Sequence, residues 1–267
     1  MSDSNAPGTI LEIREITKYF GGLCAVKNFS LSLPHGALWG LIGPNGAGKT
    51  TVFNLITGLI PLTSGVIDLD GERIDGLEAY EITRLGIART FQNIRLFSSL
   101  SVLDNVRIAY HAHAEYSLAD SVLRTRRFQD KEKELTDQAL DFLSIFKLDG
   151  IAEEIAKNLP YGEQRRVEIA RALACKPKVL LLDEPAAGMN PREIIELMDL
   201  IHFIRDRFKL TILLIEHQMR VVMGICERIT VMDFGEVIAR GTPKEIGADQ
   251  TVVEAYLGKG VATSAAG

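Results

Sequence analysis

The stretch Gly43-Pro44-Asn45-Gly46-Ala47-Gly48-Lys49-Thr50 governs the interpretation of the whole sequence. Two glycines five positions apart, followed by a lysine and a hydroxyl residue, form the pattern of a phosphate-binding loop. An apolar run at residues 37–42 precedes the loop, and apolar residues follow it at helical spacing before Pro61. These residues are Val52, Leu55, Ile56 and Leu59. The sequence therefore predicts a strand, a phosphate-binding loop and a helix starting near Lys49.

Each residue type in this loop has a mechanical reason to be there. Glycines let backbone N–H groups approach a polyphosphate, and the following helix directs the positive end of its dipole at the anion. We expect Lys49 to reach the outer phosphates and Thr50 to offer its hydroxyl to Mg²⁺, which prefers hard oxygen ligands. The alternative, a flexible turn, is disfavoured by the position between a strand and a helix. The expected nucleotide contacts are Gly43, Pro44, Asn45, Gly46, Ala47, Gly48, Lys49, Thr50 and Thr51.

A second element, residues 179–184, has four apolar residues followed by Asp183 and Glu184. Taken alone, it is a buried strand that ends in an acidic loop. Because the strands of a parallel sheet end at the edge where ligands bind, we expect Asp183 to face Mg²⁺ and Glu184 to face the attacking water. Phosphoryl transfer needs charge neutralisation and an oriented nucleophile, and two carboxylates supply both.

The rest of the chain changes its patterning twice. Residues 10–33 alternate short apolar runs with turn signals at residues 21–22 and 34–36, which predicts a small antiparallel sheet. Residues 97–159 are expected to be mainly helical, because Ser101 and Asp104 form a variant capping box and an apolar helical face follows. That face consists of Leu135, Ala139, Phe142, Leu143 and Phe146.

Strands and helices alternate after Leu159. Such alternation implies a parallel sheet covered on both faces, and hence an α/β fold. We expect helices at residues 165–174 and 192–208, and strands at 179–182, 210–215, 229–232 and 237–239.

The composition excludes several classes of protein. With 267 residues, 46% of them hydrophobic, the chain is long and apolar enough for a globular core. A net charge of −5 argues against a protein that coats nucleic acid. No apolar run reaches membrane-spanning length, and the polar residues 1–8 do not resemble a secretory signal. Three widely spaced cysteines favour ordinary packing over a disulfide or a zinc site.

One charged stretch has two interpretations. Residues 124–134 contain five basic and three acidic side chains. A solvated helix face is the favoured interpretation, and a patch for anionic lipid or nucleic acid is the alternative.

With these motifs in this order, residues 10–257 resemble an ATP-binding-cassette (ABC) ATPase, the nucleotide-binding subunit of a transporter. The resemblance implies a P-loop NTPase (RecA-like) parallel-sheet core with an N-terminal antiparallel β subdomain and a helical insert. Phe20 stands where the family stacks an aromatic ring on adenine, Gln92 where a glutamine links the metal to the membrane partner, and His217 where a switch histidine contacts the terminal phosphate. Singly, these residues have plainer explanations, as core, loop and structural residues.

The resemblance assigns roles to particular side chains. The implied catalytic residues are Lys49, Gln92, Glu184 and His217, and the implied metal-facing residues are Thr50, Gln92 and Asp183.

The family signature, usually Leu-Ser-Gly-Gly-Gln, falls on Leu159-Pro160-Tyr161-Gly162-Glu163, where only the leucine and the second glycine match. In the family this loop closes over the phosphate bound by the opposite subunit, so Tyr161, Gly162 and Glu163 are implied nucleotide contacts. Pro160 has neither a hydroxyl group nor a backbone N–H. Asn190 likewise replaces an aspartate that the family often has at its dimer contact.

These departures are similar to one branch of the family. Leu-x-Tyr-Gly-x-Gln-Arg-Arg at 159–166, Ala-Ala-Gly-x-Asn-Pro at 186–191 and Ala-Arg-Thr-Phe-Gln-Asn at 88–93 resemble the first of the two ATPase subunits of branched-chain amino-acid uptake transporters. Relatives that carry urea or aromatic acids share much of this pattern.

The resemblance also implies partners. It implies a second ABC ATPase subunit, two transmembrane permease subunits whose coupling helix docks near residues 91–100, and indirectly a periplasmic or extracellular solute-binding protein. We expect a heterodimer rather than a homodimer, because a homodimer would present the Pro160 loop to both sites. The implied location is peripheral, at the cytoplasmic face of the plasma (inner) membrane, with no nucleic-acid partner.

The expected domain organisation is a flexible N-terminus at 1–9, one ABC ATPase domain at 10–258 and a flexible tail at 259–267. Within the domain, residues 10–96 and 165–241 form the nucleotide-binding core, 97–164 a helical subdomain and 242–258 a C-terminal helix.

Two rival functions use the same motifs. A soluble ABC ATPase acting on DNA or ribosomes typically adds a coiled coil or a second cassette, and neither is visible in the sequence. A scaffold that binds ATP without cleaving it lacks the carboxylate or the histidine, whereas Glu184 and His217 are both present.

Overall fold

The computed structural model describes residues 8–110 and 125–257. The expectations for residues 1–7 and 258–267, and for Arg124, lie outside the described residues. The chain divides into two compact units, one made of residues up to Arg89 and from Lys178 onward, the other of Thr90–Pro177. Within the described ranges, no helix combines the length and the apolar character needed to cross a membrane.

The first unit contains the antiparallel sheet predicted at the N-terminal end. Strands β1 (Thr9–Phe20) and β2 (Leu23–Pro34) form a hairpin, as expected from the turn at residues 21–22. The sequence did not predict β4 (Ser64–Leu69) and β5 (Glu72–Arg73), which extend this sheet to the order β2-β1-β4-β5.

A six-stranded sheet lies in the same unit, in the order β10-β9-β3-β8-β7-β6. The predicted parallel pairing is confirmed for the five strands from β9 to β6. It is wrong for β10, which runs antiparallel to β9 because only Phe234 and Gly235, both with positive φ, connect them. The strands are β3 (Leu38–Ile42), β6 (Ile87–Arg89), β7 (Val179–Asp183), β8 (Thr211–Ile215), β9 (Arg228–Asp233) and β10 (Glu236–Gly241).

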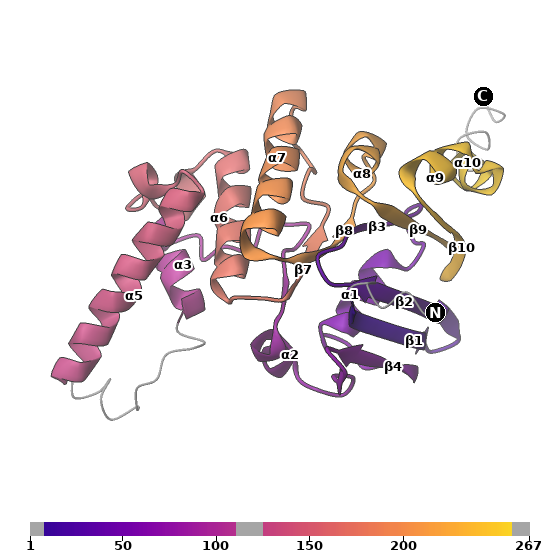
Figure 1. Ribbon diagram of the computed structural model, residues 1–267, viewed down its shortest axis with the longest axis horizontal. Coiled ribbons are helices and arrows are strands. Elements are labelled where there is room, and N and C mark those ends of the chain that lie inside the picture. Colours follow the sequence, from indigo (N-terminus) through magenta and orange to yellow (C-terminus); the bar gives the residue numbers. More distant parts are fainter. Residues whose placement is uncertain (1–7, 111–124, 258–267) are drawn as a thin grey trace, which may run out of the picture. The chain divides into compact units, whose positions relative to one another are not determined.

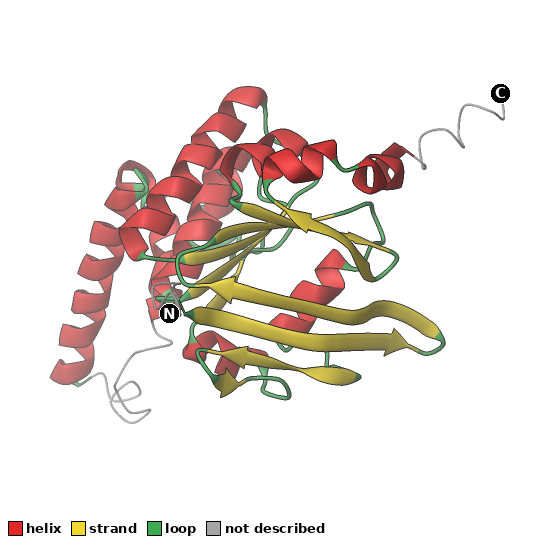
Figure 2. Cartoon of the chain, turned by 45° about the vertical axis from the view of Figure 1, so that its right-hand side comes forward, coloured by secondary structure: helices red, strands yellow, loops and turns green. Residues whose placement is uncertain are grey.

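The helix after the phosphate-binding loop, α1 (Lys49–Ile56), lies between the two sheets (Figure 2). Its apolar side chains join those of β1, β3 and β7 in one buried cluster. The prediction that Leu59 continues this helix is wrong. Gly58 adopts a left-handed conformation with φ of 67°, which ends the helical path and leaves Leu59 half exposed.

Two helices cover the opposite face of the six-stranded sheet, α7 (Pro191–Phe208) and α8 (Met219–Ile225) (Figure 1). Gly40 of β3 allows this close packing, because a Cβ there would lie 3.1 Å from Cys226 Sγ and 3.3 Å from Val222 Cγ1. Helix α7 was predicted from the sequence, whereas α2 (Ala79–Leu85) and α8 were not.

The C-terminal helix expected at residues 242–258 is two helices, α9 (Pro243–Ala248) and α10 (Gln250–Leu257). Asp249 separates them, with an extended backbone and a carboxylate that accepts from the Thr251 N–H at 2.8 Å. A side chain that caps a new helix start in this way breaks a continuous helix.

The second unit is helical, as predicted, with α3 (Val102–Tyr110), α5 (Arg126–Ile145) and α6 (Tyr161–Ala174) packed on one another. Two short 3₁₀ turns, Asp149–Ile151 and Ala156–Asn158, connect α5 to α6. The predicted apolar face of α5 is buried, and its Phe142 ring meets Tyr110 edge-on at 6.0 Å between centroids.

The helix ends of this unit refine two expectations. Ser101 Oγ accepts from the Asp104 N–H at 3.0 Å as predicted, but the Asp104 carboxylate pairs with Arg107 rather than with the Ser101 amide. Helix α6 starts at Tyr161, earlier than expected, because the extended Pro160 stands just before it and its carbonyl accepts the Gln164 N–H at 3.0 Å.

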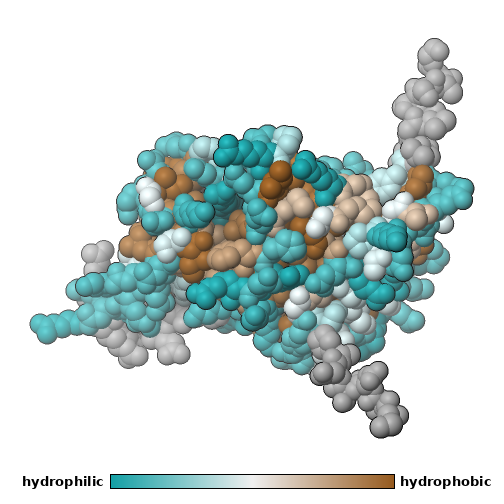
Figure 3. All heavy atoms as spheres, turned by 45° about the horizontal axis from the view of Figure 1, so that its top comes forward, coloured by the Kyte–Doolittle hydropathy of each residue, from teal (hydrophilic) through white to brown (hydrophobic). Residues whose placement is uncertain are grey.

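The face of the molecule drawn in Figure 3 is mixed in polarity. On the face drawn in Figure 3, apolar side chains are interspersed with hydrophilic ones. Scattered exposed apolar residues of this kind are normal for a globular protein.

Candidate functional site

The phosphate-binding loop connects β3 to α1, as the sequence predicts. Its glycines Gly43, Gly46 and Gly48 all have positive φ. A Cβ at Gly43 would lie 2.0 Å from the Met232 carbonyl oxygen, and one at Gly48 would lie 2.5 Å from that of Ala25. Neighbouring backbone therefore excludes any side chain at these two positions.

Lys49 directs its ammonium group across this loop. Its Nζ donates to the carbonyl oxygens of Gly43 at 2.8 Å and Pro44 at 2.9 Å, and the residue is buried. Thr50 is exposed on the first turn of α1 and Thr51 follows, half-buried. Because the first amides of a helix have no intrahelical acceptor, this helix start offers N–H donors beside a cation.

The carboxyl end of β7 carries Asp183, which is buried in an ion pair that the sequence did not reveal. Arg89 Nη2 donates to Asp183 Oδ2 at 2.6 Å, and Arg89 Nη1 donates to Asn54 Oδ1 of α1 at 2.7 Å. Arg89 thereby connects β6, β7 and α1. An arginine ending an apolar three-residue strand is the signal that was available for finding it.

Glu184 and His217 meet at the same edge of the sheet. His217 Nδ1 lies 3.4 Å from Glu184 Oε2, with the glutamate side chain 14% and the histidine side chain 48% exposed. Glu184 has a φ of 46°, and its N–H donates to the Ile215 carbonyl at 2.8 Å. Positive φ in a glutamate is unusual and persists where surrounding structure fixes it.

A second glutamate was missed in the sequence. Glu216, between β8 and His217, is fully buried, and its carboxylate accepts backbone N–H groups from Ala186, His217 and Gln218. Burial raises the pKa of Glu216, while these amides and His217 act in the opposite direction. A charged residue directly after four apolar ones was the signal in the sequence.

Phe20 ends β1 with its ring half exposed, so the alternative of a core residue is wrong for it. Lys18 Nζ lies 5.2 Å from the centre of that ring, and Tyr19 and Leu23 are also exposed nearby in the hairpin. An exposed aromatic face of this kind is available for stacking.

Gln92 and the signature loop both belong to the second unit. Arg165 of α6 is fully buried and donates to the carbonyl oxygens of Phe91 at 2.7 Å and Gln92 at 2.8 Å. It also pairs with Glu168 at 2.6 Å, and Glu168 accepts the Arg95 N–H at 3.1 Å. The loop that contains Gln92 and the start of α6 are therefore fastened by one buried ion pair.

The first turn of α6 carries the signature residues themselves. The Tyr161 hydroxyl lies 3.0 Å from Arg165 Nη2, while Gly162 and Glu163 are half-buried.

Among the described residues, no three His, Cys, Asp or Glu side chains form a metal-binding group. Mg²⁺ prefers hard oxygen ligands and binds together with nucleotide phosphates, and the exposed Thr50 hydroxyl and the Asp183 carboxylate are oxygen donors of that kind.

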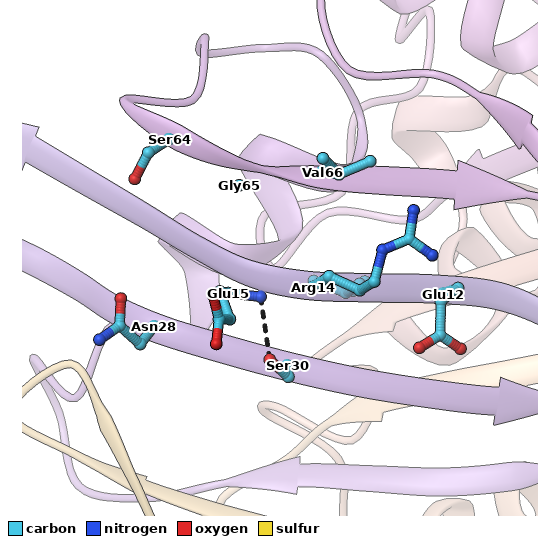
Figure 4. Close-up of a pocket in the computed structure, with 9 residues that line it drawn as sticks. Glu12, Arg14, Glu15, Asn28, Ser30, Ser64, Gly65 and Val66 are labelled. Carbon is cyan, nitrogen blue, oxygen red and sulfur yellow. Dashed lines mark hydrogen bonds between the residues drawn. The ribbon is translucent and has the colours of Figure 1, made fainter.

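A pocket on the antiparallel sheet is separate from these residues (Figure 4). It lies where β1 bulges at Glu15, whose N–H donates to Ser30 Oγ at 2.9 Å. None of the site residues predicted from the sequence lines it.

Comparison with known proteins identifies the family. Residues 26–187 match the ABC transporter family, and residues 236–262 match the family described as branched-chain amino acid ATP-binding cassette transporter. The chain belongs to the ABC transporter ATP-binding proteins.

Named relatives are similar along nearly the whole length. The high-affinity branched-chain amino acid transport ATP-binding protein BraF of Pseudomonas aeruginosa is 44% identical over 94% of this chain and 98% of its own. LivG of Escherichia coli K12, with the same description, is 44% identical at the same coverage. The lipopolysaccharide export system ATP-binding protein LptB of that strain is 36% identical over 93% of this chain and 97% of its own.

Solved ABC cassettes share the fold. The ADP conformation of an ATP-binding cassette of an ABC transporter superposes with a TM-score of 0.82 at 32% identity, covering 94% of this chain and 99% of that one. A dimeric post-hydrolysis cassette bound to ADP and phosphate gives a TM-score of 0.74 at 26% identity, over 88% and 99%. The predicted P-loop NTPase fold is confirmed.

Two departures from the ABC pattern have local structural roles here. Pro160 stands at the N-cap of α6 without a side-chain cap. Asn190 caps α7, because its Oδ1 accepts the N–H groups of Arg192 and Glu193, both at 3.0 Å. Both replacements therefore lie at helix starts.

Proposed function

We propose that this chain is the ATP-binding and ATP-hydrolysing subunit of an ABC importer for branched-chain amino acids. The observation that carries the proposal is the sheet edge at which the loop after β3, Glu184 after β7 and His217 after β8 come together. Parallel strands of a P-loop fold bind phosphates and orient water at that edge. The 44% identity with BraF and LivG supports the solute class.

ATP binds along the loop and the first turn of α1 in this proposal. Backbone N–H groups of Gly43 and of residues 45–51, together with the Lys49 ammonium, hold the phosphates, and the exposed Phe20 ring stacks on adenine. Thr50 and Asp183 would hold Mg²⁺ through their side-chain oxygens. When bound, the ion neutralises phosphate charge.

Glu184 orients the attacking water and His217 contacts the terminal phosphate. The 3.4 Å contact between His217 Nδ1 and Glu184 Oε2 supports these two roles. A carboxylate that accepts a proton or positions water needs a neighbouring group that fixes its orientation. Lys49→Ala should abolish nucleotide binding, measured with a fluorescent ATP analogue. Unchanged affinity for the ATP analogue would contradict the proposed role of Lys49 in phosphate binding.

The working assembly is a heterodimer of ATPase subunits. Tyr161, Gly162 and Glu163 of this chain contact ATP held by the opposite subunit, and Pro160 removes one backbone donor from that contact. A sister subunit with a complete signature loop gives one site its full set of donors. Full transport-coupled hydrolysis by a homodimer of this chain with the permease would contradict the heterodimer.

Two permease subunits complete the transporter, with a coupling helix docked on residues 91–100 and a solute-binding protein outside the membrane. The chain is peripheral, at the cytoplasmic face of the plasma membrane. ATP binding drives the ATPase dimer from an open to a closed state. The closed dimer holds the terminal phosphate from both sides, so it binds ATP more tightly than the open dimer does.

The test is uptake in vesicles that contain the chain, its sister subunit and the permease. Labelled leucine, isoleucine or valine should enter with ATP, and urea or an aromatic acid should not. Uptake of urea or an aromatic acid instead would move the chain to that branch. ATPase activity indifferent to the permease would favour a soluble ABC ATPase.

A further inference from the structure

The chain just after β8 is joined to the chain just after β7 by one buried side chain. In the parallel register Asp183 lies opposite Ile215, so the segments that start at Glu184 and Glu216 leave the sheet side by side. Glu216 Oε1 crosses between them and accepts the Ala186 N–H at 2.8 Å. Its Oε2 accepts the N–H groups of His217 at 3.1 Å and Gln218 at 3.2 Å.

Gln218 makes the reciprocal connection. Its Nε2 donates to the Ala186 carbonyl oxygen at 2.9 Å. Both polar groups of the Ala186 backbone are thus held by side chains of the other segment, two residues beyond Glu184. We call these four bonds, made by Glu216 and Gln218, the clamp.

The clamp acts where the backbone is strained. Glu184 has a positive φ, and the turn after it is closed by the Ala187 N–H donating to the Glu184 carbonyl at 3.2 Å. A non-glycine residue keeps such a conformation only when its neighbours fix it. The hydrogen bonds to the Ala186 backbone, inside that turn, are among the contacts that fix it.

A carboxylate is the side chain that suits this position. It offers two oxygens to N–H donors on opposite sides, whereas an amide offers one oxygen and turns its own NH₂ toward the other donors. Burial alone disfavours a carboxylate strongly, so a fully buried glutamate that accepts three backbone N–H groups has costly desolvation offset by specific hydrogen bonds.

We infer that Glu216 is a positioning residue that holds Glu184 and His217 at their working separation. It acts through the backbone of Ala186 on one side and of His217 on the other, and the inference rests on the proposed ATPase function. Glu216 touches neither the nucleotide nor the attacking water in this account. Its loss should lower turnover while ATP affinity stays the same.

The test compares Glu216→Gln with the wild-type chain in the assembled transporter. We expect kcat for ATP hydrolysis to fall roughly tenfold to a hundredfold, the size of effect that a small misplacement of catalytic groups produces. KM for ATP and the affinity for a fluorescent ATP analogue should stay within about twofold. Because a smaller folded fraction also lowers the apparent kcat at unchanged KM, the rate is expressed per nucleotide site, counted by titration with the fluorescent ATP analogue in the same preparation. A role in folding alone would leave this rate per site at the wild-type value.

A second variant and a control keep the outcome clear. Gln218→Leu removes only the bond to the Ala186 carbonyl, so it should lower kcat less than Glu216→Gln does. Glu227→Gln is the control for the same change away from the site. Glu227 accepts a backbone N–H from Leu38 and pairs with Arg205, but its side chain is 52% exposed and it lies at the other end of the sheet, before β9. Its kcat should equal that of the wild type.

The outcomes separate the two claims. Wild-type kcat in both clamp variants, or kcat and ATP affinity that fall together, would overturn the positioning role. Glu184→Gln measured in the same preparation tests the proposed function separately. If Glu184→Gln hydrolyses ATP normally, the proposed function fails first and the clamp has nothing to position.

Discussion

Arg89 and Asp183 form a buried ion pair, with Nη2 and Oδ2 separated by 2.6 Å and side chains 5% and 4% exposed. Arg89 is the last residue before the chain enters the second unit, and Asp183 is the carboxylate proposed to face the metal. One contact therefore fixes both the end of β6 and the Asp183 carboxylate.

Breaking this pair from one side should destabilise the protein strongly. Arg89→Met leaves the buried Asp183 carboxylate without its guanidinium partner, and the free energy of unfolding should fall by about 3–5 kcal/mol. Denaturant unfolding measures it. Arg192→Met is the control, because the Arg192–Glu196 pair is on the surface, with Arg192 89% exposed. This variant should change the free energy of unfolding little. Equal losses of unfolding free energy in both variants would contradict a larger contribution from the buried pair.

Two glycines of the phosphate-binding loop should respond differently to alanine. Gly43→Ala places a Cβ 2.0 Å from the Met232 carbonyl oxygen, so the loop must move and both thermal stability and ATP binding should fall sharply. Gly46→Ala meets nothing within 4 Å and has only its positive φ to accommodate, at about 1–2 kcal/mol. Thermal melts with and without ATP distinguish them, and identical melts would count against the geometry.

The Arg165–Glu168 pair should show strong coupling. Arg165→Met or Glu168→Leu alone leaves a charge buried and should cost about 3–5 kcal/mol of unfolding free energy. The double variant removes both charges, so it should lose much less than the sum of the single losses. Urea unfolding of all four chains gives the coupling energy. Additive losses would mean that the two side chains act independently.

Cys226 should be inert in the folded chain. Burial raises the pKa of its thiol to about 12, so the reactive thiolate is scarce at pH 8. Mass spectrometry after a short exposure to iodoacetamide should find Cys24, which is partly exposed, modified before Cys226. Denaturant should abolish the difference. Rapid labelling of Cys226 in the native chain would show that its environment is open.

The sequence predicts the elements whose signals are local. The loop at residues 43–50, strands β3, β7 and β8, and helix α7 follow from composition and spacing over a few residues. Strand β6 was missed because it has only three residues, and β4 because its stability comes from pairing with a distant partner, β1. Tertiary pairing of this kind leaves little trace in the strand itself.

The same limit applies to the candidate site: residues in local motifs were predicted, and residues defined by long-range contacts were not. The sequence placed Glu184 and His217 each just after a predicted strand of the parallel sheet, and the structure brings the two side chains to 3.4 Å. It did not reveal Arg89, Glu216 or Arg165, whose roles consist of long-range contacts to Asp183, Ala186 and the Gln92 loop. A charged residue beside an apolar run marks such a position, but its partner emerges only from the fold.

The central claim is that ATP held at residues 43–51 is hydrolysed by a water that Glu184 orients. Hydrolysis and binding by Glu184→Gln in the assembled transporter test it most directly. The amide keeps the size of the side chain but cannot accept a proton, so ATP affinity should stay within about twofold while kcat falls by roughly 10²–10⁴. Turnover near the wild-type value, with ATP still bound, would contradict the account.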